Sequence, residues 1–203
     1  QFWAGSMRDD VEAVRTDGWV DAAKPVQVTD SSDRDPVDYT VGKAKYRSVI
    51  LPRDLVVKHY CVKQQVALVA AESELARVES SLDELVDEHG VEDGALEPAL
   101  SDAGKLTKAQ LKTALKEASD AGQDIADELA LLKQAEGLMD EVAAAKKAVK
   151  DASAALEAAV AAGYAGLDES KIVSLVVDEK WLAAVSGFVD SELDAVRSQL
   201  VDR

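Results

Sequence analysis

Two stretches of this chain carry apolar residues at alternating intervals of three and four positions. They run from residue 68 to 85 and from residue 131 to 159. This spacing places the apolar side chains of each stretch on one face of a helix, and such a face needs a second helix to cover it. The pattern therefore predicts two long helices that pack together. Their seam positions are Leu68, Ala71, Leu75, Val78, Leu82 and Leu85 on the first helix, and Leu131, Ala135, Leu138, Val142, Ala145, Val149, Ala152, Leu156 and Ala159 on the second.

The composition fits close helix packing better than a broad globular core. Of the 203 residues, 47% are hydrophobic but only 4% are aromatic, and much of the apolar fraction is alanine. The formal net charge of −16 repels nucleic acid at long range, so the chain alone would be a poor DNA clamp. The single cysteine, Cys61, is typical of a reducing compartment, and no stretch is long enough to span a membrane. We therefore expect a cytoplasmic location.

Glycine, proline and charged residues divide the chain into three predicted regions. Residues 1–52 should form an N-terminal helix, a loop and a short hairpin, and residues 164–203 should form C-terminal helices. Residues 53–163 should form an antiparallel coiled-coil arm with a tip insertion at 90–123. The predicted fold is thus mainly α, with a base built from both chain ends. A parallel dimer of two chains is an open alternative, although it leaves the sister helix of each chain without a role.

Capping signals give the expected bounds of the long helices and of the tip helix. Asp54 is a candidate N-cap for a first long helix that ends at His89, before a glycine. The second long helix should span 124–163. Between them, Thr107 and Gln110 match a capping box that starts a short helix. In the base, strands at 39–41 and 46–51 should flank a glycine turn as a hairpin.

Two helices are predicted near the C-terminus. Leu167 and Asp168 form a staple and cap for a short helix over 169–175, and a brief break at 176–178 should separate it from a helix over 180–201. The last helix has a broad apolar face, which we expect to be buried, with the N-terminal helix and Trp3 as the nearest cover. That face consists of Trp181, Val185, Phe188, Val189, Leu193, Val196 and Leu200.

A search for reactive groups finds little. There is no glycine-rich phosphate loop and no cysteine–histidine cluster with metal spacing, and His59 and His89 are best interpreted as solvated or packed side chains. The segment from Asp35 to Tyr39 is interpreted as an Asp-Pro turn that feeds a strand, because it lacks the second proline of a base-gripping methyltransferase motif. We therefore predict no catalytic, cofactor or metal residue in this chain.

Four lysines near the predicted tip occur without an acid between them. They are Lys105, Lys108, Lys112 and Lys116, and the last three lie four residues apart on one helix face. They could contact a phosphate backbone or an acidic partner. The favoured interpretation is a solvated face, and the contact is the alternative.

Several strings of the sequence resemble the C-terminal region of the modification subunit of type I restriction–modification systems. They follow the order of that family over nearly the whole chain, and the last is the most specific. The strings are Phe2-Trp3-Ala4 with Met7-Arg8-Asp9-Asp10-Val11, then Asp17-Gly18-Trp19, Tyr39-Thr40-Val41-Gly42-Lys43 with Lys45-Tyr46, and Leu175-Val176-Val177-Asp178-Glu179-Lys180-Trp181-Leu182.

The resemblance implies a parent protein that methylates adenine in DNA with S-adenosylmethionine. The cofactor loop and the catalytic motif of the family would lie before Gln1, so we expect this chain to be a fragment, without catalytic or cofactor residues of its own. The resemblance also implies that the region assembles the complex, by docking the specificity subunit and helping to clamp DNA beside the restriction subunit. The alternatives are a free-standing acidic coiled-coil adaptor or chaperone-like module, and an enzyme contained in these residues.

Overall fold

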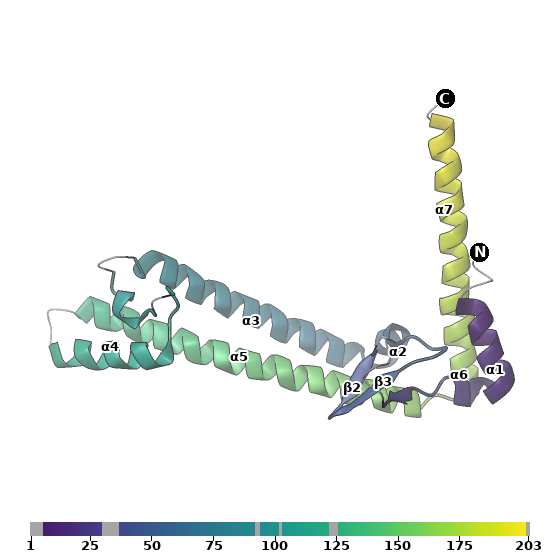
Figure 1. Cartoon of the computed structure of the whole chain (residues 1–203), viewed down its shortest axis with the longest axis horizontal. Coiled ribbons are helices and arrows are strands. Elements are labelled where there is room, and N and C mark those ends of the chain that lie inside the picture. The colour runs from purple at the N-terminus through teal and green to yellow at the C-terminus, as the bar shows by residue number, and fades with distance from the viewer. Residues whose placement is uncertain (1–5, 30–36, 92–93, 102, 122–125, 202–203) are drawn as a thin grey trace. The chain divides into compact units, whose positions relative to one another are not determined.

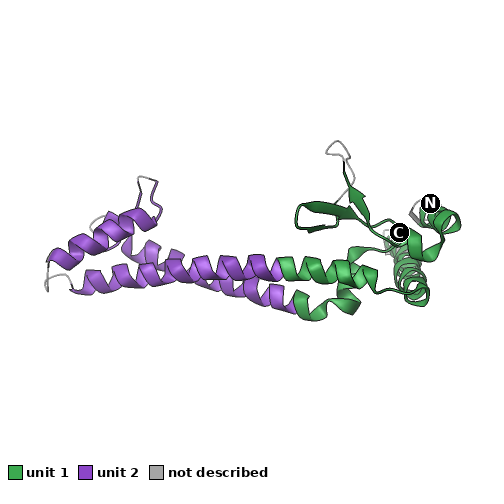
Figure 2. Ribbon diagram, turned by 90° about the horizontal axis from the view of Figure 1, so that it is seen from below, with its two compact units in different colours: residues 1–65, 154–203 green, residues 66–153 purple. Residues whose placement is uncertain are grey.

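The computed structural model describes residues 6–29, 37–91, 94–101, 103–121 and 126–201, and most of these are helical (Figure 1). The prediction of a mainly α fold is confirmed. The described part of the chain divides into two compact units (Figure 2). The first contains residues 1–65 and 154–203, so both chain ends belong to it, and the second contains residues 66–153. The second unit, residues 66–153, lies within the expected arm of residues 53–163.

The first described element of the first unit is α1 (Ser6–Ala22), which belongs to the predicted N-terminal helix. Its backbone kinks at Gly18, where φ is 78°. Only glycine adopts this conformation at little cost, so the residue type explains why the helix changes direction here. The kink sets the direction of Trp19, which follows it. The other parts of the expected N-terminal helix, including Trp3, lie outside the described residues.

A three-stranded antiparallel sheet follows, in the order β1-β3-β2. Its strands are β1 (Val26–Val28), β2 (Tyr39–Val41) and β3 (Ala44–Arg47). The hairpin of β2 and β3 lies where it was predicted, but the expected strand over 46–51 is wrong, because β3 ends at Arg47 and begins at Ala44, which pairs directly with Val41 and shortens the turn. Gly42 has a φ of 63° in this turn, as tight hairpins require. Strand β1, whose three residues pair with β3, was not predicted.

The expected helix over 54–89 is wrong in one respect, because the structure breaks it into α2 (Arg53–Tyr60) and α3 (Val62–His89). Cys61 stands between them with non-helical angles and a fully buried side chain. Asp54 is not the N-cap either, since Pro52 holds that position and Asp54 lies in the first turn. The end of α3 at His89 agrees with the prediction.

The second unit pairs the main parts of α3 and α5 (Ala126–Ala165) and adds the tip elements η2 (Glu97–Ala99), a 3-10 helix, and α4 (Lys108–Ala121). Half of the predicted capping box of α4 is present, since the Gln110 amide donates to Thr107 Oγ1 at 3.4 Å, whereas the Thr107 amide donates to the Ala99 carbonyl and not to the Gln110 side chain. The buried core of this unit comes from α3, the tip and α5. It consists of Leu85, Leu96, Ala99, Leu111, Ala114, Ala118, Leu132 and Ala135.

The seam positions of the second unit are buried or half-buried, with Val78 at 1% and Leu85 at 7% exposure. The two helices run antiparallel within this unit, because Glu79 on α3 forms an ion pair with Lys146 on α5 at 2.9 Å, while Leu85 shares the core with Ala135. Residue numbers thus rise on one helix as they fall on the other. The burial of these positions shows which faces the two helices share, but it does not show that the helices wind around each other. A coiled-coil supercoil therefore stays a prediction.

The C-terminal segment completes the first unit with α6 (Glu169–Val173), the π-helix η4 (Ser174–Trp181) and α7 (Leu182–Val201). The predicted cap of α6 is present, as Asp168 Oδ1 accepts from the Lys171 amide at 3.0 Å. The expected break at 176–178 is wrong. An eight-residue π-helix carries the chain into α7 without an interruption, and this helix type gives no apolar period by which a sequence would show it.

Candidate functional site

A buried carboxylate joins the two ends of the chain within the first unit. Asp10 on α1 is only 4% exposed, and its Oδ2 lies 2.5 Å from Lys180 Nζ. The indole Nε1 of Trp181 donates to the same oxygen at 2.9 Å. Lys180 Nζ also donates to the carbonyl of Ile50 at 2.8 Å. A buried charge needs such partners to offset its lost hydration, and Asp10 has them.

The ring of Trp19 packs beside Trp181, with centroids 5.9 Å apart and planes inclined at 47°. We call Asp10, Trp19, Lys180 and Trp181 the terminal cluster. Its members come from three of the strings that carry the family resemblance. Nothing in the sequence predicted that Asp10 and Lys180 would meet, because 170 positions separate them.

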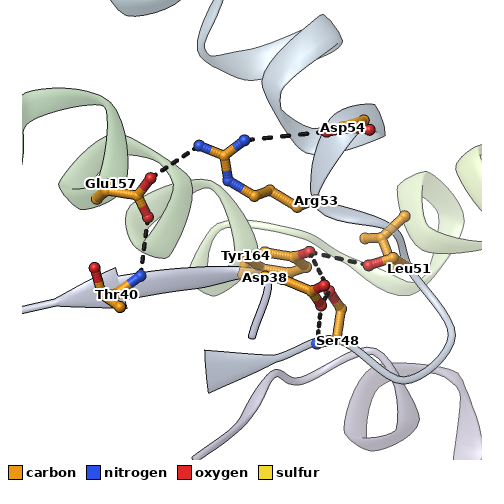
Figure 3. Close-up of polar contacts among 8 residues, drawn as sticks. All are labelled: Asp38, Thr40, Ser48, Leu51, Arg53, Asp54, Glu157 and Tyr164. Atoms are coloured by element: carbon orange, nitrogen blue, oxygen red, sulfur yellow. Dashed lines mark hydrogen bonds and ion pairs between the residues drawn. The ribbon is translucent and has the colours of Figure 1, made fainter. Parts of the chain in front are cut away.

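A second polar network fastens the hairpin to α5 and α2 in the same unit (Figure 3). Glu157 on α5 accepts from the Thr40 amide at 3.0 Å and from Arg53 at 2.9 Å. The Tyr164 hydroxyl donates to the Leu51 carbonyl at 2.9 Å and lies 3.1 Å from Ser48 Oγ. These bonds hold the sheet against the helices.

Asp38 closes this network, because it accepts from both the amide and the hydroxyl of Ser48. Tyr39 stacks between Tyr46 and Tyr164, at centroid distances of 5.1 and 5.7 Å. Burial raises the pKa of Tyr39 to about 12, and it also raises the pKa of Tyr164, so both phenols stay neutral. Since both faces of Tyr39 are covered, it cannot stack on a base, and its packing agrees with the structural interpretation of the 35–39 segment. Residues 35 and 36 lie outside the described residues.

A cavity of about 460 Å³ opens beside the stacked tyrosines in the first unit. Its walls are mostly apolar, with Ile172 and Leu167 opposite Tyr39, and Lys24 at the edge. The Lys24 ammonium already forms an ion pair with Asp21 at 2.5 Å. The cavity therefore offers no free charge that would select a ligand.

The four lysines of the tip belong to the second unit and remain exposed. Lys108 forms an ion pair with Asp140 on α5 at 2.6 Å. Lys112 and Lys116 lie on the same face of α4, whereas Lys105 precedes the helix. The basic face is thus partly neutralised by α5.

The apolar face of α7 is not buried as expected. Five of its large side chains are 41–55% exposed, namely Leu182, Val185, Phe188, Val189 and Leu193. Only Trp181, at the start of the face, packs in the terminal cluster. The side chains of Val196 and Leu200 lie outside the described part. We call the five exposed residues the α7 stripe.

Two histidines and one cysteine complete the survey of reactive side chains. His59 Nε2 lies 2.5 Å from Glu179, which Lys58 also contacts, and these bonds lower the pKa of Glu179. His89 lies at the end of α3, and burial raises the pKa of the Cys61 thiol, which therefore stays protonated. No group of acidic, histidine and cysteine side chains in the described ranges could hold a metal ion. None of the described helices is long and apolar enough to cross a membrane.

We interpret the terminal cluster and the hairpin network as structural, since their charged groups have partners and the Ser48 hydroxyl that faces Asp38 is also bonded to Tyr164 within the network. The α7 stripe is different, because five large apolar side chains lie uncovered along one helix, more than in the exposed row of Val62, Val66 and Val69 on α3. We therefore regard it as the candidate functional surface. Comparisons of the chain with protein-family models, curated proteins and solved structures found no match.

Proposed function

We propose that this chain is the non-catalytic C-terminal assembly region of the modification subunit of a type I restriction–modification system. In this proposal it docks the specificity subunit and helps to clamp DNA. The observation that carries the proposal is the α7 stripe, because an exposed helix face of this kind is the usual element by which helices join a bundle.

The terminal cluster supports the choice of family. Strings from residues 7–11, 17–19 and 175–182 carry the resemblance, and each contributes a side chain to this cluster. Unrelated strings that matched by chance would have no reason to contact one another across the whole chain. We therefore treat the three strings, which meet in the terminal cluster, as one joint feature in support of the resemblance.

The remaining parts of the proposal concern the parent protein. It would be an S-adenosylmethionine-dependent, adenine-specific DNA methyltransferase in the cytoplasm, with the restriction subunit and DNA as further partners. None of the strings matched here belongs to the cofactor loop or the catalytic motif, so this chain would contribute assembly and not chemistry. The alternative is a free-standing acidic coiled-coil adaptor or chaperone-like module. A cofactor loop and a catalytic motif encoded upstream would decide against it.

Co-purification of the full modification subunit with its specificity subunit tests the docking role. We expect Val189→Asp, in the α7 stripe, to abolish co-purification, because it places a charge in an apolar interface. Val66→Asp is the matched control, since Val66 is 63% exposed on α3 and Val189 is 49% exposed. Equal recovery of the specificity subunit with both variants would refute docking through α7.

The DNA part of the proposal rests on the tip lysines and needs its own test. Changing Lys105, Lys108, Lys112 and Lys116 to glutamine in the assembled complex should reduce the salt dependence of DNA binding if they contact phosphates. Lys112 and Lys116 should contribute most, because Lys108 already pairs with Asp140. An unchanged salt slope would remove the tip from the DNA interface.

A further inference from the structure

We infer that α7 docks a partner helix whose apolar face is bordered by lysine or arginine, and that one of these cations lies opposite Glu192. The inference deepens the proposed function, on which it rests for the claim that the α7 stripe is a docking surface. It adds the chemistry that the partner must have.

Glu192 lies within the α7 stripe and not on the opposite face of the helix. It follows Val189 by three residues and Phe188 by four, and residues at these intervals are neighbours on one helix face. It also follows Val185 by seven residues, which is two turns. Glu192 is exposed, and among the described residues it has no hydrogen bond or ion pair. A helix that covers the stripe must therefore cover this carboxylate too.

Covering an unpaired carboxylate removes its hydration, and this cost opposes the gain from the apolar contact. The same carboxylate favours binding when the partner supplies a cation for it. The rest of α7 strengthens this preference. Asp190 borders the stripe on its other side, and the nearest base, Arg197, is already paired with Asp194 at 3.1 Å. The surface around the stripe is thus acidic and has no free cation in the described part of α7.

The same charges disfavour the other occupants of an exposed apolar helix. A second copy of α7 would bring its own Asp190, Glu192 and Asp194 to the interface. DNA and anionic lipid surfaces carry negative charge and would be repelled by these acids. A helix whose apolar face is bordered by lysine or arginine complements both the apolar and the charged side chains of α7.

Two helical probe peptides with the same apolar face test the inference. One has lysines along the borders of that face and the other has glutamates at the same positions, and each is titrated into the full chain by fluorescence anisotropy. We expect the lysine peptide to bind at least tenfold more tightly. The variant Glu192→Lys should lose this preference, and Val189→Asp should abolish binding of both peptides.

The net charge of −16 attracts any cationic peptide, so a charge control is needed. Asp151→Lys makes the same change of charge at an exposed position on α5 and should leave the preference intact. If Glu192→Lys and Asp151→Lys behave alike, the preference is unspecific and the inference is overturned. Equal binding of the two peptides, or no binding of either, would also overturn it.

The experiment separates this inference from the proposed function. If the peptides discriminate as expected but the specificity subunit fails to co-purify, the identity of the partner is wrong and the chemistry of the surface stands. If the specificity subunit co-purifies equally with the wild-type and the Glu192→Lys protein, the docking role stands and the cation opposite Glu192 does not.

Discussion

Removing Asp10 should destabilise the first unit more than removing Asp10 and Lys180 together. In Asp10→Leu, the Lys180 ammonium keeps only the Ile50 carbonyl, and the Trp181 indole loses its acceptor. The Lys180 side chain is 19% exposed and Asp10 only 4%, so neither charge is well hydrated once it is alone. Asp10→Leu therefore leaves an uncompensated, largely buried cation.

Breaking a buried ion pair by removing one partner costs about 3–5 kcal/mol. The partial exposure of Lys180 allows some hydration, so we expect about 3 kcal/mol for Asp10→Leu. In Asp10→Leu/Lys180→Met both charges are gone. Both variants leave the indole N–H of Trp181 unpaired, so the double variant differs in that an unpaired Ile50 carbonyl, which costs about 1–3 kcal/mol, replaces the uncompensated cation. The double variant should thus be more stable than the single one.

Tryptophan fluorescence during urea unfolding reports on this unit, because residues 3, 19 and 181 are the three tryptophans of the chain and all belong to it. Circular dichroism follows the helices of both units in parallel. If the two substitutions add to within about 0.5 kcal/mol, Asp10 and Lys180 do not interact energetically and the reasoning is refuted.

Three further changes have definite expected outcomes. Gly163→Ala should destabilise the first unit by about 1–3 kcal/mol in thermal or urea unfolding, because the added Cβ would lie 2.8 Å from Val56 Cγ1. Gly137→Ala is the control on the same helix. Its Cβ meets no atom within 4 Å, so it should stabilise the protein by about 0.5–1 kcal/mol. Val78→Asp, at a seam position with 1% exposure, should destabilise the second unit by about 3 kcal/mol or more in circular dichroism melts, and an effect as small as that of Val66→Asp would contradict the seam. The backbone and side-chain bonds from Lys171 lower the pKa of Asp168 to about 2, so its contribution to stability should be present above about pH 4, decline as the pH falls from about 4 towards 2, and be gone below 2. An NMR titration of this carboxyl with a midpoint near 4 would refute the cap.

The parts of the fold that the sequence predicted are those specified by neighbouring residues. The seams of α3 and α5 follow from intervals of three and four, and the caps at Thr107 and Asp168 follow from a side chain and an amide three residues apart. The hairpin follows from a glycine between two short β-prone runs. In each case the signal and the structure lie within a few turns of one another.

The parts that the sequence did not predict depend on distant contacts. No glycine or proline indicates the helix break at Cys61. The complete burial of the Cys61 side chain is what explains a cysteine at this position. Glu157 and Arg53 meet across 104 positions, and no neighbouring residue indicates this contact. The uncovered α7 stripe could not be foreseen either, because an apolar face in a sequence does not say whether its partner belongs to the same chain.

The π-helix connects the terminal cluster to the α7 stripe. Lys180 and Trp181 are consecutive, and in an α-helix consecutive side chains point about 100° apart, yet both reach the same oxygen of Asp10. Both are the last residues of η4, directly before α7 begins. Asp10 thereby sets the rotation of α7 about its own axis, and so determines which side of this helix the stripe occupies. This gives the ion pair a role that an apolar contact of equal strength would not fill, because leucine and methionine in its place would hold the helices together without specifying their rotation.

We therefore expect Asp10→Leu/Lys180→Met to weaken binding of a partner on α7 by more than its effect on unfolding accounts for. Co-purification with the partner, measured beside urea unfolding of the same variant, checks this, and a loss of binding that only follows the loss of stability would refute it.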